Sequence, residues 1–171
     1  MENLTKWLPY TLAIGFGATA AMDLWRLGMQ RVFGVSSLDL GLLGRWVGHS
    51  MRGRIVHHPI GQSPRITGEL AIGWVSHYAI GMGFAVLLPV FWGVNWLASP
   101  SVLPALVIGL GTIFAPWLIM QPAMGLGLAA RFAKKPNAVR LRNLAIHTVY
   151  GFGLYFSALG MRFLSNKAGA I

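Results

Sequence analysis

The sequence contains no cysteine, which excludes disulfide bonds, thiolate metal sites and thiol chemistry. Acidic residues are also scarce, with 4 Asp and Glu against 14 Lys and Arg in 171 residues. Charged residues make up 11% of the chain, under half of the roughly 25% that is typical of globular proteins. Because 55% of the residues are hydrophobic, the composition indicates an integral membrane protein.

Familiar catalytic motifs are missing as well. The sequence has no Gly-x-Ser-x-Gly elbow, no His-Glu-x-x-His and no P-loop. A hydrolytic enzyme is therefore not expected, and a role without catalysis is favoured over an enzyme. The net charge of +10 does not predict nucleic-acid binding, because that function needs a basic face on a soluble fold.

Four apolar segments are long enough to cross a bilayer, which requires about 20 predominantly apolar residues. We therefore predict an all-α polytopic membrane protein whose four transmembrane helices form one domain over residues 1–171. The first segment is expected to be retained, because it is too long for a signal peptide and lacks a small-residue cleavage site. The predicted spans are residues 8–29, 70–97, 102–128 and 141–164.

Basic residues gather in two of the three connections between these spans. The connection at residues 95–100 carries no charge. Lys and Arg in short loops mark the cytoplasmic side, so we expect both basic loops inside and both termini outside, in the periplasm if the host is a Gram-negative bacterium. The basic residues are Arg31, Arg45, Arg52, Arg54 and Arg65 in the first loop, and Arg131, Lys134, Lys135, Arg140 and Arg142 in the third.

Two local features modify this simple pattern. Residues 38–47 are too apolar for a free loop and too short to span, so they predict an interfacial helix with Arg45 and Trp46 at headgroup level. Pro116 predicts a kink in the third span. Tryptophans are expected near the outer interface, where aromatic belts lie: Trp7, Trp92 and Trp96.

The chain carries an internal repeat. The pattern His-x-x-x-Gly-x-Gly occurs at His77 and again at His147, and the preceding spans share Ile-Gly-x-Gly at residues 14–17 and 108–111. This predicts a duplicated two-helix hairpin, with copies at about residues 8–97 and 102–164. Small residues at four-residue spacing let helix backbones approach closely in lipid, so the glycines also suit a packing seam.

Polar residues in the four spans share one depth. At 1.5 Å per residue, Asp23, His77, Gln121 and His147 fall about 10 Å below the cytoplasmic surface, with Glu69 nearer to it. Intramembrane ionisable residues are costly and usually functional. We therefore predict that these five residues form a site for a ligand or a proton inside the membrane, near its cytoplasmic side.

Each of these residues also has a structural explanation. Asp23 and Arg26 lie three residues apart and can neutralise each other. The two histidines can bond neighbouring helices, and Glu69 can stabilise the start of its helix. His57 and His58 lack a third ligand, so no metal site is predicted.

Three functions remain open. A transport or proton- or cation-coupled role fits the polar layer, and it would call for a homodimer or a larger membrane complex because four helices enclose little volume. A b-type haem protein would use His77 and His147 as axial ligands. The third is a structural or accessory subunit without chemistry of its own.

Four segments also carry a likeness to a known family: residues 17–25, 44–49, 120–125 and 136–142. Through them the chain resembles a family of small four-span bacterial integral membrane proteins catalogued only as a domain of unknown function. The resemblance extends from about Tyr10 to Arg162. It implies a bacterial inner-membrane protein and brings no activity, substrate or cofactor.

Overall fold

The computed structural model describes residues 2–35 and 39–167, which form helices joined by turns. No β-strand occurs within these ranges, so the all-helical class is confirmed. The helices are α1 (Glu2–Phe33), α2 (Leu40–Ser50), α3 (Glu69–Ala85), α4 (Leu87–Trp92), α5 (Asn95–Ala98), α6 (Val102–Gly111), α7 (Gln121–Ala123) and α8 (Pro136–Lys167), with short turns of 3₁₀-helix at Ile60–Gln62 (η1) and Leu128–Ala130 (η3) and a π-helical turn at Pro116–Met120 (η2).

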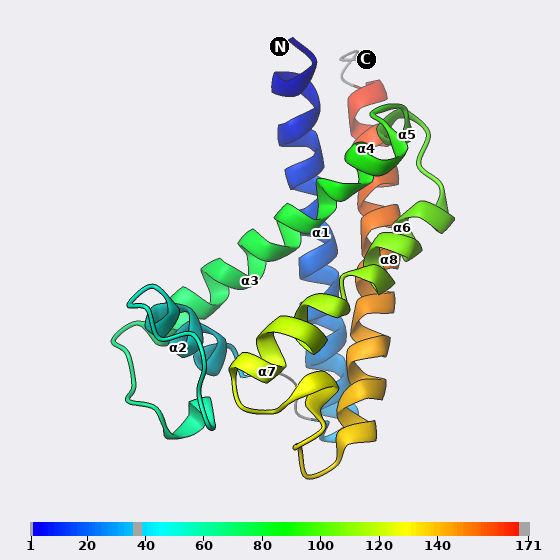
Figure 1. The fold of residues 1–171 in the computed structure, drawn as a ribbon. Coiled ribbons are helices and arrows are strands. Elements are labelled where there is room, and N and C mark those ends of the chain that lie inside the picture. The colour runs from blue at the N-terminus through cyan, green and yellow to red at the C-terminus, as the bar shows by residue number, and fades with distance from the viewer. Residues whose placement is uncertain (1, 36–38, 168–171) are drawn as a thin grey trace.

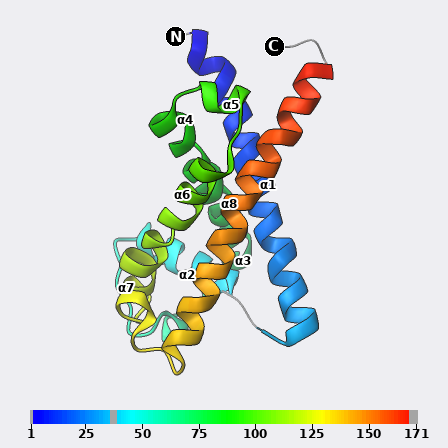
Figure 2. The ribbon, with the colours of Figure 1, turned by 90° about the vertical axis from the view of Figure 1, so that its right-hand side faces the viewer.

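The long helices α1 and α8 run antiparallel and pack against each other (Figure 1), and they cross at an angle that is clear in Figure 2. Helix α3 crosses α1, and α6 packs on α8. The beginning of α1 and the end of α8 lie at one end of the molecule with α4 and α5 (Figure 1). The α2 region and the turn before α8 lie at the opposite end. The two basic loops therefore share one end.

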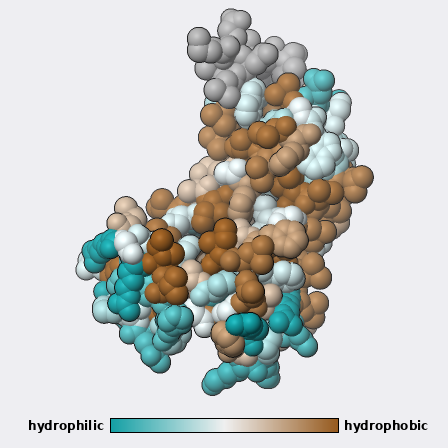
Figure 3. Space-filling view, viewed as in Figure 1, coloured by the Kyte–Doolittle hydropathy of each residue, from teal (hydrophilic) through white to brown (hydrophobic). Residues whose placement is uncertain are grey.

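Three helical segments are long and apolar enough to cross a membrane: Glu69–Trp92, Val102–Ala123 and Pro136–Ser165. The first predicted span lies in α1, whose 32 residues provide ample length. This helix is not among the three because Asp23, Arg26 and Pro9 lower its apolar character. Much of the upper surface in Figure 3 is nevertheless hydrophobic, and hydrophilic residues gather at the lower end.

The predicted second and third spans are interrupted helices. Helix α3 gives way to α4 at Val86, shortly before Pro89. Helix α6 ends at Gly111, and the chain then winds into the π-helical turn η2, in which the Gln121 N–H bonds the Pro116 carbonyl. The kink predicted near Pro116 is confirmed, since proline provides no N–H for a regular helix.

The apolar segment of the first loop forms α2, as predicted. Asp39 caps it by accepting a 2.8 Å hydrogen bond from the Gly41 N–H. Leu40 and Leu43 are buried. Leu38, with which the predicted segment begins, lies outside the described residues. The position of α2 at a membrane surface stays a prediction.

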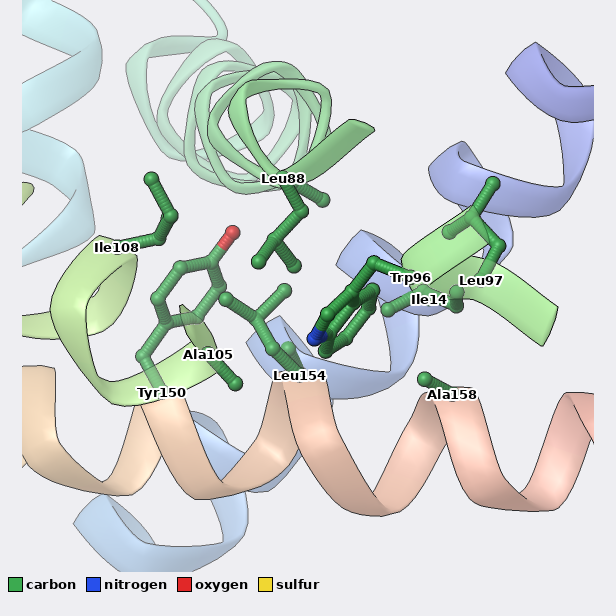
Figure 4. Close-up of a cluster of buried hydrophobic side chains, with 11 residues drawn as sticks. Ile14, Leu88, Trp96, Leu97, Ala105, Ile108, Tyr150, Leu154 and Ala158 are labelled. Atoms are coloured by element: carbon green, nitrogen blue, oxygen red, sulfur yellow. The ribbon is translucent and has the colours of Figure 1, made fainter. Parts of the chain in front are cut away.

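The hydrophobic core lies where the end of α3 meets α1, α4, α5, α6 and α8 (Figure 4). The Tyr150 hydroxyl crosses it to donate a 2.5 Å hydrogen bond to the Gly81 carbonyl. Trp96 is only 5% exposed, and its indole N–H donates to the Ser101 carbonyl at 3.3 Å. Its predicted place in an outer aromatic belt is wrong, because α5 folds its side chain into the core. Trp92 remains 41% exposed.

Glycines set two close helix crossings. A Cβ on Gly15 would lie 2.6 Å from the Met82 Cα and 3.1 Å from the Gly81 carbonyl oxygen. A Cβ on Gly109 would lie 2.5 Å from the Gly151 Cα. Backbones that approach this closely leave room only for hydrogen at these positions.

Candidate functional site

An ion pair joins α2 to the start of α3. Arg45 donates from Nε to Glu69 Oε2 and from Nη2 to Oε1, both at 2.8 Å, which is a bidentate pair. Its Nη1 also donates to the carbonyls of Gly61 and Ser63 at 3.3 Å. Glu69 additionally accepts from the Ile66 N–H at 3.2 Å. The hydrogen bonds that Arg45 donates to Glu69 raise the pKa of the Arg45 guanidinium above its usual value.

Two sequence interpretations change here. Arg45 is 6% exposed, so its predicted place at headgroup level is wrong, because its charge is satisfied inside the protein by Glu69. Glu69 does more than stabilise its own helix, since it pairs with a residue 24 positions earlier. No local sequence pattern indicates that pair.

Helix α2 packs on α3 through direct backbone contact. A Cβ on Gly44 would overlap the Glu69 carbonyl oxygen, and a Cβ on Gly73 would overlap the Leu40 carbonyl oxygen. The two glycines thus face each other across the crossing. Their approach brings the Arg45 side chain within reach of Glu69.

The rest of the first loop is also fixed in place. His57 is 1% exposed, with Nδ1 2.7 Å from Ser63 Oγ and Nε2 3.0 Å from the Arg54 carbonyl oxygen. Its backbone N–H donates to the Ala123 carbonyl at 2.7 Å, and the Ile60 N–H donates to that of Met124 at 3.0 Å. His57 therefore ties the first loop to the end of α7, a role that the sequence did not indicate.

Asp23 and His77 form a pair across the α1–α3 interface. His77 Nε2 lies 3.2 Å from Asp23 Oδ1, and their side chains are 19% and 16% exposed. The same oxygen lies 3.5 Å from Arg26 Nη2. Helical spacing explains the second contact, because Asp23 and Arg26 are three residues apart. The contact with His77 joins residues 54 apart in the sequence.

Aromatic rings cover this pair. The Trp74 ring meets the His77 ring edge-on at 6.3 Å between centroids, and Tyr78 meets it edge-on at 5.7 Å. Arg26 lies over the Trp74 ring at 5.5 Å. Asp23 Oδ2 is buried and has no short, well-aligned hydrogen bond within the described residues, while the neighbouring Tyr78 hydroxyl also interacts with this carboxylate. A buried carboxylate oxygen of this kind is costly unless a proton or cation reaches it.

His147 has a different environment. Its Nδ1 lies 3.0 Å from Thr112 Oγ1 and 3.2 Å from the Gly109 carbonyl oxygen. Thr112 in turn donates to that same carbonyl at 2.7 Å. His147 therefore bonds the end of α6 at the close Gly109–Gly151 crossing, which is how a histidine joins two helices in an apolar setting.

Gln121 belongs to a fourth group, between α7 and α8. Its side chain is buried, and its Nε2 donates at 2.6 Å to the Asn143 amide oxygen, which also accepts from Trp117 Nε1 at 3.0 Å. The Asn143 nitrogen then donates to the Val139 carbonyl at 3.3 Å. The π-helical turn brings Trp117 and Gln121 to the same partner.

The profile of a family described as "Protein of unknown function (DUF2938)" matches residues 12–161. The chain belongs to this family. No curated protein and no solved structure matches the chain.

In this DUF2938 protein, the five residues of the predicted layer are distributed among four groups. Asp23 and His77 contact each other. His147, Gln121 and Glu69 bond Thr112, Asn143 and Arg45 respectively. Haem ligation by His77 and His147 stays a prediction; it requires His77 Nε2 to leave Asp23 or iron to bind at Nδ1.

Proposed function

We propose that this family member is a four-span protein of the bacterial inner membrane. In this arrangement α1, the α3–α4 segment, the α6–α7 segment and α8 all cross the bilayer, and α1 crosses with Asp23 and Arg26 turned toward α3. The shared end of the two basic loops supports a cytoplasmic position for both. The matching Gly15–Gly81 and Gly109–Gly151 crossings support a duplicated hairpin.

A reporter tests this topology. Alkaline phosphatase fused after residue 171 should be active, because this enzyme folds only in the periplasm. The same enzyme inserted at Lys135 should be inactive, and a cytoplasmic reporter there should be active. The opposite pattern at both sites contradicts the proposed orientation.

We further propose that the Asp23–His77 pair binds and releases a proton or a small cation as part of transport. The observation that carries this proposal is the 3.2 Å contact between the two side chains, which joins two helices and is mostly shielded from solvent. Histidine is the side chain whose unperturbed pKa permits a change of charge near neutral pH. Paired ionisable groups within a membrane typically mark ion and proton pathways.

The partners of the pair suit this role. Protonation of His77 strengthens its attraction to the Asp23 carboxylate, and Arg26 competes for the same oxygen. Whether His77 or Arg26 is the stronger partner of the Asp23 carboxylate thus depends on the charge of His77. His147 and Gln121 are engaged in bonds between helices, so we assign them to packing around the site.

Proton flux into proteoliposomes tests this function. A potassium diffusion potential drives protons inward, and a trapped pH-sensitive dye reports the rate. We expect the wild-type protein to acidify the lumen faster than empty liposomes do, and His77→Ala to return the rate to that background because the imidazole is the proton-binding group.

The matched control is His58→Ala, which removes an exposed imidazole from the first loop. It should retain the wild-type rate. Equal amounts of reconstituted protein and equal melting temperatures separate a loss of flux from a loss of folding. A well-folded His77→Ala variant with wild-type flux contradicts the proposal and favours an accessory subunit.

A further inference from the structure

Two loops at the basic end expose apolar side chains next to arginines. In the first loop, Met51 is 83% exposed and is followed by the exposed residues Arg52, Arg54 and Ile55. In the turn before α8, Phe132 is 67% exposed between Arg131 and Lys134, which are exposed as well. Exposed large apolar residues interleaved with cations are typical of protein surfaces that lie at the membrane interface.

Backbone hydrogen bonds join these two loops next to their exposed residues, so both loops lie at the same end of the molecule. The bonds from His57 and Ile60 to the end of α7 hold the first loop against residues 123–125. Gly125 packs so closely on this loop that an added Cβ would lie 2.6 Å from the His57 carbonyl oxygen. We call residues 51–56 together with residues 128–134 the basic surface.

A side-chain hydrogen bond supports the second half of the basic surface. Ala129 and Ala130 have positive φ angles of 46° and 57°, a left-handed conformation that is uncommon for residues other than glycine. Arg140 of α8 fixes the turn by donating from Nε to the Ala129 carbonyl at 2.9 Å. The Arg131 guanidinium lies 4.5 Å from the centre of the Phe132 ring. The turn therefore presents a cation and an apolar ring together.

The chain has almost no negative charge with which to neutralise this surface. The sequence contains 4 acidic residues, namely Glu2, Asp23, Asp39 and Glu69. Asp39 caps α2, and Glu69 is bonded to Arg45. Glu2 begins α1 at the opposite end, and Asp23 pairs with His77. The counter-charge for the basic surface must come from outside the chain.

We propose that the basic surface binds the headgroups of anionic phospholipids. The phosphates meet Arg52, Arg54, Arg131 and Lys134, and the exposed apolar side chains enter the boundary between headgroups and acyl chains. Charge complementarity selects an anionic lipid over a zwitterionic one, since each Lys or Arg near a membrane surface contributes to that attraction. The exposed apolar residues favour a lipid over a soluble anion, which offers them no contact.

Native mass spectrometry of the detergent-purified full chain tests this site. The protein is titrated with short-chain phosphatidylglycerol or phosphatidylcholine, and bound lipid is counted. We expect phosphatidylglycerol to bind more tightly, and R52Q/R54Q to weaken that binding about tenfold or more while binding of phosphatidylcholine changes little. I55S/V56S should weaken both lipids alike, because an apolar contact does not distinguish headgroups.

The matched control is R162Q, an exposed arginine near the other end of α8, which should leave both affinities unchanged. Should R52Q/R54Q not fold, the wild-type preference for phosphatidylglycerol must still fall as salt is raised, because exposed charges are screened. Equal affinity for the two lipids overturns the proposal. The proposal is also overturned if R162Q lowers the preference for phosphatidylglycerol as much as R52Q/R54Q does. Full displacement of phosphatidylglycerol by millimolar inorganic phosphate overturns it as well.

Discussion

Arg45→Ala should lower the free energy of unfolding by about 3 kcal/mol, the lower end of the range for breaking a buried ion pair. The loss is large because Glu69 would remain, mostly covered, without its bidentate partner. It falls short of the largest losses because the Glu69 side chain is 18% exposed and water can solvate part of its charge. Unfolding in mixed micelles with increasing SDS measures this difference.

Two further variants sharpen the test. Arg65→Ala removes an exposed cation from the same loop and should change stability by no more than about 0.5 kcal/mol. The double variant Arg45→Met/Glu69→Leu removes both charges and should recover much of the loss, since replacing a buried pair with apolar residues is often neutral. Arg45→Ala with wild-type stability would show that the pair does not hold α2 to α3.

Gly73→Ala should have the second large effect, a loss of about 3 kcal/mol or more, at the upper end of the cost of overpacking. The added methyl group would overlap the Leu40 carbonyl oxygen, which is backbone and has no rotamer to adopt. Helix α2 would have to move away from α3, and Arg45 would move with it. Thermal denaturation of the purified protein measures the loss.

Gly83→Ala is the matched control on the same helix. A Cβ at Gly83 meets no atom within 4 Å, so the substitution should be neutral or slightly stabilising because alanine favours helix over glycine. Equal melting temperatures for Gly73→Ala and Gly83→Ala would contradict the close crossing.

Much of the fold follows from local patterns. Apolar runs predict spans at residues 70–97, 102–128 and 141–164, because length and hydropathy are properties of short windows. These overlap the three apolar helical segments of the structure, Glu69–Trp92, Val102–Ala123 and Pro136–Ser165. Pro116 predicts the interruption after α6, and an apolar stretch predicts α2. The family assignment made from sequence is confirmed over residues 12–161.

Tertiary partners could not be predicted in the same way. Arg45 and its partner Glu69 are 24 residues apart in the sequence, and Asp23 and His77 are 54 residues apart. The depth of a residue in a helix does not reveal which neighbouring helix its side chain meets. Equal depth therefore placed His77 and His147 in one layer, although they have different partners in the structure. Trp96 shows the same limit, because only the turn of α5 directs it inward.

A double-mutant cycle between Asp23 and His77 tests the proposed site most directly. Asp23→Asn, His77→Ala and the double variant are compared for proton flux in the proteoliposome assay. If the two side chains act as one proton site, each single variant removes the flux and the double variant is no worse, which is a strongly non-additive result. Wild-type flux in either single variant, or two partial losses that simply add, would contradict it.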